Sequence, residues 1–222
     1  RSPAPQRRSA LAFTPPGRAA PPAAAAEARQ LSSGSLVARG LLQPLEQERR
    51  AELEGRLLDR LPGAELVGAF RVAGRHAAMY EALRASLGGQ SGGAPPLERE
   101  LWHGTPWDSV PKILQQGFNR SFAGRHGTLL GVATYFSTDP AYSQRFCDRS
   151  GGGEDGTKVL FFARVLVGTF CKGCSSDVEP PLKDAETGER FDSTVDNEEK
   201  PGIFAVFRDF QALPLFLVEF RA

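Results

Sequence analysis

Leu101-Trp102-His103-Gly104-Thr105 is the stretch that decides the fold of this chain. Its apolar residues end a strand predicted over 97–103. Thr105-Pro106 has the form of a helix N-cap followed by proline at the first helical position. A helix is therefore predicted over 106–117. A histidine between a strand and a capped helix can line a cleft, and the glycine after it lets a ligand approach the backbone closely.

Thr134-Tyr135-Phe136 is the second informative stretch, in a strand predicted over 132–137. Asp139-Pro140 repeats the cap pattern and predicts another helix that runs to about Asp148. Ser143 and Phe146 follow Tyr135 by eight and eleven residues. Tyr135 could be a core aromatic, and the other two could form one face of an ordinary amphipathic helix. Their joint spacing from Tyr135 favours a site instead.

The rest of the pattern fixes the fold class. Helices are predicted over 44–61 and 76–87, and further strands over 64–72, 159–170, 203–207 and 215–220. Runs of strands with a few short helices indicate an α+β fold rather than a parallel, doubly wound sheet. No Gly-x-Gly-x-x-Gly turn joins a strand to a helix, which argues against a Rossmann-type dinucleotide site.

Composition narrows the class of protein. The 222 residues include 27 basic and 26 acidic side chains, a net charge of +1 that gives no electrostatic reason to expect general nucleic-acid binding. Three cysteines favour a reducing, intracellular compartment, cytoplasm or nucleus, over a disulfide framework. No stretch reaches the roughly 20 apolar residues of a membrane span.

The chain divides into three segments. Residues 1–43 are rich in Arg, Ala and Pro and poor in acids, which predicts a disordered linker; a transit peptide is the alternative. Residues 44–96 form a helical and strand lead-in. Residues 97–222 form the predicted catalytic core.

Together these motifs resemble the catalytic domain of the poly(ADP-ribose) polymerase superfamily, and most closely its mono-ADP-ribosyltransferase branch, of His-Tyr-Ile type. The resemblance covers 64–222, including Gly117-Phe118-Asn119-Arg120-Ser121 and Arg164-Val165-Leu166. It implies a diphtheria-toxin-like fold of two packed, mostly antiparallel sheets with short helices. NAD would lie in the cleft between them as the co-substrate, with no metal.

The resemblance also implies a role for each matched residue. The catalytic set is His103, Tyr135 and Ile203. NAD would be held by His103 on the ribose hydroxyls, by the Gly104 backbone on the carboxamide, by Tyr135 and Phe146 on the two faces of nicotinamide, and by Thr105, Ser143 and Arg120. The loop 118–131 matches a donor loop over NAD, where Arg120, Arg125 and His126 could face the diphosphate or simply be exposed.

Ile203, counted back eight residues from Gln211, stands where polymerases of the family carry a glutamate. Glu198 and Glu199 come four or five residues too early, so no acid is expected there. The ribosyl transition state is cationic, as in glycoside cleavage, and the site lacks its own anion. We expect an acidic side chain of the acceptor protein to bring the charge and then to attack, so that one ADP-ribose is added per site.

Two other functions stay open. Val132-Ala133 replaces a Lys-Gly pair of the family, which favours a module that keeps the fold without turnover and binds NAD weakly or serves protein interaction. Transfer to nucleic-acid ends is not supported by the near-neutral charge. Protein acceptors, the chain itself included, are the expected partners, and a monomer is expected. Cys171-Lys172-Gly173-Cys174 has the spacing of a zinc or redox pair but stands alone, so it predicts a turn.

Overall fold

The computed structural model describes residues 32–90, 97–122, 128–147 and 156–222, and Ser32–Ala222 form one compact unit. Arg125 and His126 lie outside the described residues, as does the predicted linker up to residue 31. None of the helices in the described part is long and apolar enough to cross a lipid bilayer.

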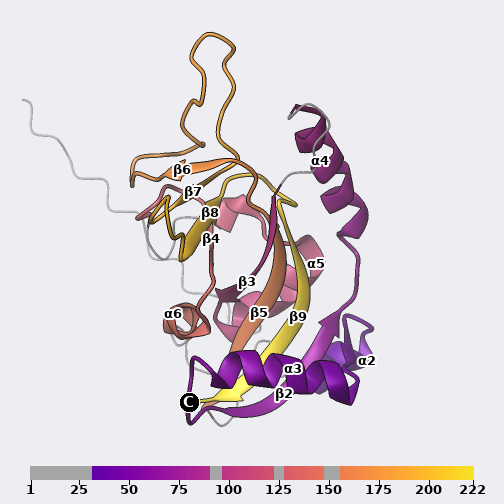
Figure 1. Cartoon of the computed structure of the whole chain (residues 1–222). Coiled ribbons are helices and arrows are strands. Elements are labelled where there is room, and N and C mark those ends of the chain that lie inside the picture. The colour runs from indigo at the N-terminus through magenta and orange to yellow at the C-terminus, as the bar shows by residue number, and fades with distance from the viewer. Residues whose placement is uncertain (1–31, 91–96, 123–127, 148–155) are drawn as a thin grey trace, which may run out of the picture. The chain divides into compact units, whose positions relative to one another are not determined.

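The described strands form one hydrogen-bonded sheet in the order β1-β2-β9-β5-β3-β4-β8-β7-β6 (Figure 1). Their bounds are β1 Leu42–Pro44, β2 Glu65–Val72, β3 Glu98–Gly104, β4 Thr134–Ser137, β5 Lys158–Leu166, β6 Phe170–Lys172, β7 Ser193–Val195, β8 Ile203–Val206 and β9 Ala212–Arg221. Only β6 and β7 pair in parallel among these strands. The predicted α+β class and the mostly antiparallel pairing are confirmed.

The structure has a single sheet, and the two packed sheets that were expected correspond to its two halves. Strands β1, β2, β9, β5 and β3 make one half, and β4, β8, β7 and β6 make the other. Between β3 and β4 the only registered pair in the described residues is Trp102 with Ser137. His103 and Gly104 follow that pair at the end of β3.

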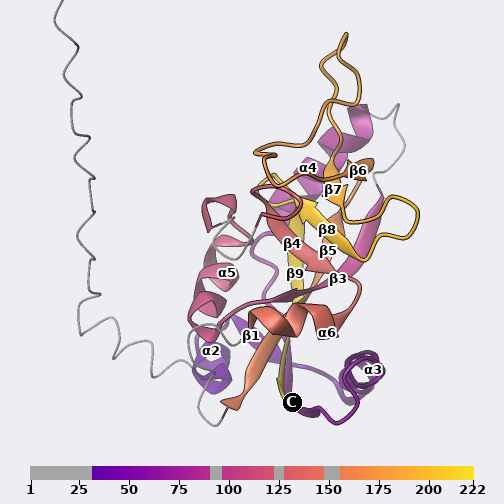
Figure 2. The same cartoon turned by 90° about the vertical axis from the view of Figure 1, so that its left-hand side faces the viewer.

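The core explains why helices cover both faces of the first half. Strand residues alternate between faces, so Phe216, Val218 and Phe220 of β9 point one way and Leu217 the other. Helix α3 (Gln47–Leu58) packs its buried leucines on the first face, in a cluster that includes Phe162 and Trp102. Figure 2 shows α3 on one side of the strands and α5 (Val110–Gln116) on the other.

The other helices are short or peripheral. They are α2 Ser33–Ala38, α4 Ala77–Gln90, α6 Pro140–Ser143 and the 3-10 turns Trp107–Ser109, Arg120–Phe122 and Gln144–Phe146. Helix α4 buries Tyr80 and Leu87 against Leu166 and Leu213. Predicted helices 106–117 and 139–148 are thus each a helix joined to a 3-10 turn.

Three sequence expectations differ from the structure. Disorder up to residue 43 is wrong for 33–43, because Leu36, Leu41 and Leu42 are buried and β1 pairs with β2. The strand predicted over 159–170 breaks after β5 at Gly168, whose φ of 51° is a left-handed conformation. The predicted strands include none between 171 and 202, where the structure has β7, whose three residues are all buried.

Candidate active site

His103 is the second-last residue of β3, which neighbours β4 in the sheet. Its Nδ1 is 2.8 Å from the main-chain oxygen of Tyr135. A carbonyl only accepts, so Nδ1 carries the proton, and Nε2 is the acceptor atom of the neutral ring. The ring also packs against Phe118 and Phe136, with centroids 5.0 Å and 5.3 Å away. These contacts fix the imidazole between the two halves of the sheet.

Gly104 lets α6 approach the end of β3. A Cβ at position 104 would overlap the carbonyl oxygen of Ser143 and would lie 3.4 Å from the Cβ of Phe146. The hydroxyl of Ser143 is buried and donates to the main-chain oxygen of Trp102 at 3.1 Å. The Ser143 proton is therefore already used, which leaves its lone pairs for an N–H donor such as a carboxamide.

Tyr135 is anchored by its hydroxyl. The oxygen accepts from Leu130 N and donates to Gly131 O, both at 2.7 Å. Burial raises the pKa of this hydroxyl, and the Leu130 N–H that it accepts opposes the rise. Gly131 itself requires glycine, since its φ is 112° and a side chain would meet Phe207. The ring of Tyr135 is therefore fixed to the short loop that precedes β4.

Ile203 begins β8, opposite Ser137 on β4. Residues directly opposite in an antiparallel pair share a face, so Ile203 and Tyr135 lie on the same face. Both pack against one buried cluster, formed by Leu130, Ala133, Ala205 and Phe207. The structure thus brings together two residues that are 68 positions apart in the chain.

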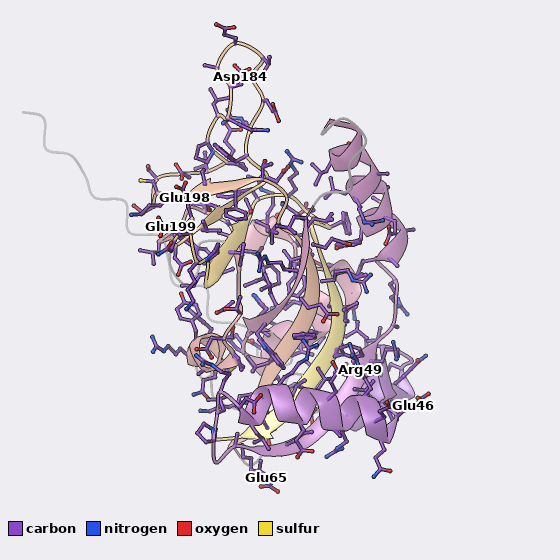
Figure 3. The ribbon with its side chains drawn as sticks, in the orientation of Figure 1. Glu46, Arg49, Glu65, Asp184, Glu198 and Glu199 are labelled. Atoms are coloured by element: carbon purple, nitrogen blue, oxygen red, sulfur yellow. The ribbon has the colours of Figure 1, made fainter. Side chains whose placement is uncertain are left out.

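An aspartate missed by sequence reasoning lies next to Ile203. Asp196 Oδ1 accepts from the main-chain N–H groups of Gly202 and Ile203, both at 2.9 Å. An acidic side chain that sequence spacing did not reveal therefore lies beside Ile203. Glu198 instead accepts from the N–H of Lys172, and Figure 3 shows Glu198 and Glu199 on the β6 side of the molecule.

Arg120, which is predicted to contact the diphosphate of NAD, bonds to other parts of the protein in this structure. Its guanidinium donates to Val178 O at 3.3 Å, and its main-chain N–H donates to Asp209 at 2.8 Å. Both contacts tie the start of the predicted donor loop to other loops. Thr105 is buried directly after β3. Phe118, which packs on His103, is quoted in the matched stretch that begins at Gly117 but was not predicted as a site residue; its place straight after the Gly117 helix end was the available signal.

The comparisons with known proteins give the family of this chain. The sequence matches the model of one protein family, described as "Poly(ADP-ribose) polymerase catalytic domain", over residues 63–176, just over half of the chain. The chain belongs to this family. The matched range contains His103, Tyr135, Ser143 and Phe146 but stops before Ile203.

Several mono-ADP-ribosyltransferases are similar to this poly(ADP-ribose) polymerase domain. Protein mono-ADP-ribosyltransferase PARP12 of Mus musculus is 36% identical over 142 residues, which are 64% of this chain and 19% of that protein. PARP10 of Mus musculus is 42% identical over 124 residues, or 55% and 13%. PARP11 of Homo sapiens is 37% identical over 146 residues, or 58% and 43%. The chain spans less than half of the length of each of these relatives.

The described part of this polymerase-family domain contains no group of three or more His, Cys, Asp or Glu side chains that could hold a metal ion. Cys171 lies half-buried on β6, and burial raises the pKa of its thiol. Cys174 is exposed in the turn that follows. A separate cavity of about 640 Å³ is lined by Arg39, Leu41, Arg75, Gln115 and Gln116, none of them a predicted site residue.

Proposed function

We propose that this chain transfers a single ADP-ribose from NAD to protein acceptors and releases nicotinamide. The observation that carries the proposal is the hydrogen bond between His103 and Tyr135 O, which holds an imidazole against the strand that carries the tyrosine. The membership of the family and the printed names of the similar proteins support the same activity. The aliphatic Ile203 favours single transfer over polymer growth.

His103 would bind the ribose of NAD. With its Nδ1 proton held by Tyr135 O, the ring can present Nε2 as an acceptor to a sugar hydroxyl. Because the hydrogen bond to Tyr135 O fixes the tautomer, Nε2 is already the acceptor before a sugar hydroxyl approaches. The hydrogen bond at one ring nitrogen of a histidine commonly sets the role of the other in this way. His103→Ala should therefore lose NAD binding and labelling together.

The nicotinamide ring would lie near Gly104, Ser143, Phe146 and Tyr135. An aromatic ring pair adds about 0.5–1.5 kcal/mol beyond the area buried, and Phe146 keeps a ring face although it has no hydroxyl. Ser143 can accept from the carboxamide N–H, since its own proton goes to Trp102 O. Holding the leaving group in this way lowers the entropy cost of reaching the transition state.

The transfer itself would be assisted by the acceptor. The bond between C1 of the ribose and the nicotinamide nitrogen breaks, and its electron pair leaves with nicotinamide, which becomes neutral. A carboxylate oxygen of an acidic acceptor side chain forms the new bond to C1, so no proton has to move. The modified carboxylate has lost its charge and cannot assist a second transfer, which gives one ADP-ribose per site.

An assay with labelled NAD tests the proposal. We expect the chain, incubated alone or with candidate acceptor proteins, to give discrete labelled bands and no ladder of longer products. His103→Ala should abolish the label while its thermal unfolding stays cooperative. If wild type binds NAD in a thermal-shift assay but never becomes labelled, the chain is a binding module; a labelled ladder would instead indicate a polymerase.

A further inference from the structure

The loop 196–202 joins β7 to β8 and places a carboxylate beside Ile203. Asp196 follows β7 directly, and its main-chain N–H donates to Ile203 O at 3.3 Å. The register of Val195 opposite Phe204 continues in this way, so Asp196 and Ile203 lie opposite each other. Because opposite residues in an antiparallel pair share a face, the side chain at 196 starts on the face that carries Ile203.

Closing the loop uses only one oxygen of this carboxylate. Oδ1 accepts both N–H groups, those of Gly202 and Ile203. Oδ2 has no hydrogen-bond partner among the described residues, and it lies 3.3 Å from where a Cβ on Gly202 would stand. An asparagine could close the loop equally well through its own Oδ1. The negative charge therefore goes beyond what the loop requires.

The charge of Asp196 reaches the helix on the other side of the site. Burial raises the pKa of the Tyr142 hydroxyl on α6; the Arg145 guanidinium opposes the rise and the Asp196 carboxylate adds to it. The ring of Tyr142 in turn contacts Phe146, with centroids 5.5 Å apart. Asp196 therefore lies beside Ile203 and close enough to α6 for its charge to act on Tyr142, next to the residues that the proposed function assigns to the nicotinamide end of NAD.

We propose that Asp196 is a fixed anion of this site, set directly after β7 instead of at position 203, which favours the cationic nicotinamide ring and the cationic ribose that forms from it. This inference rests on the proposed function. A negative charge held by the backbone before reaction stabilises developing positive charge without reorganisation. It does so without contacting the reacting atoms and without activating a hydroxyl, so it is compatible with single transfer.

Three variants separate the charge from the loop-closing bond. Asp196→Asn keeps an oxygen for the two N–H groups and removes the charge, whereas Asp196→Ala removes both. Asp184→Asn is the matched control, because Asp184 also closes a turn by accepting from two main-chain N–H groups, those of Glu186 and Thr187. Figure 3 shows Asp184 on the loop between β6 and β7, well separated from α6.

We expect Asp196→Asn to unfold at nearly the wild-type temperature while kcat falls about tenfold, which is ~1.4 kcal/mol of barrier. KM for NAD should rise by less than about threefold, and Asp184→Asn should match wild type. Activity of Asp196→Ala should rise when sodium formate replaces sodium chloride at equal ionic strength. A wild-type kcat in Asp196→Asn would overturn the proposal. If Asp196→Asn does not fold, the absence of a formate effect on Asp196→Ala would overturn it.

A binding measurement keeps this test separate from the test of transfer. By calorimetry, Asp196→Asn should bind NAD a few-fold more weakly than wild type and bind neutral nicotinamide equally well. Wild type that binds NAD without transferring it would refute the proposed function, and the binding difference would still decide the role of Asp196. Equal affinities for NAD, or no NAD binding by wild type, would overturn the inference.

Discussion

Gly104→Ala adds one methyl group at the end of β3 and should push α6 away from that strand. The new Cβ would overlap the carbonyl oxygen of Ser143, which is backbone and cannot turn aside. Overpacking of this kind costs about 1–3 kcal/mol, and displacing α6 also removes the bond from Ser143 to Trp102 O, worth about 1 kcal/mol. We therefore expect a loss of roughly 3 kcal/mol, or about 6–12 °C in Tm for a domain of this size.

The catalytic effect should be larger than the loss of stability implies. A displacement of about 1 Å at a positioned substrate can cost around 10²-fold in rate, so labelling with NAD should fall by about that factor below the unfolding temperature. Gly55→Ala is the control: Gly55 is exposed on α3 with nothing within 4 Å of a new Cβ, and alanine there should stabilise by about 0.5–1 kcal/mol. If Gly104→Ala matches Gly55→Ala in both assays, the packing argument is wrong.

Three further changes have defined outcomes. Tyr135→Phe leaves the N–H of buried Leu130 without its partner, and denaturant titration should show a loss of roughly 1–3 kcal/mol; an unchanged midpoint would contradict this. Burial raises the pKa of Glu219, so its contribution to stability is present below its ordinary pKa of 4.5 and is lost as pH rises through the folded value. Glu219→Gln should therefore have the same Tm as wild type near pH 4 and a higher Tm than wild type at pH 8. A difference in Tm that does not change with pH would contradict this. Ile203→Glu should leave single bands on a labelling gel, because an added acid does not rebuild a polymer-binding surface; a ladder would show that position 203 alone is decisive.

Local patterns were sufficient for much of the fold. Strand β3, the cap at Asp139 and β4 follow from short-range rules, since side-chain alternation and helix capping act over a few residues. The predicted cap at Thr105 is wrong, because the first turn there has Pro106 at its N-cap and no side-chain cap bond. Helix α2 and strand β1 were missed because they depend on burial of Leu36 and Leu42 against distant strands, inside a segment whose composition indicates disorder. Strand β7 was missed because three buried residues are too few for a periodic signal.

The sequence by itself determined which residues are predicted to carry the chemistry: a histidine and glycine at a strand end, a tyrosine with Ser143 and Phe146 at fixed spacing, and an aliphatic residue at 203. Only the tertiary structure decided how these parts meet. In the folded protein the Tyr135 carbonyl holds the proton on Nδ1 of His103, and the Ser143 hydroxyl donates to Trp102 O. Asp196 accepts from the main-chain N–H of Ile203. Hydrogen bonds between strands join residues without regard to their separation in the chain, and no local pattern encodes them.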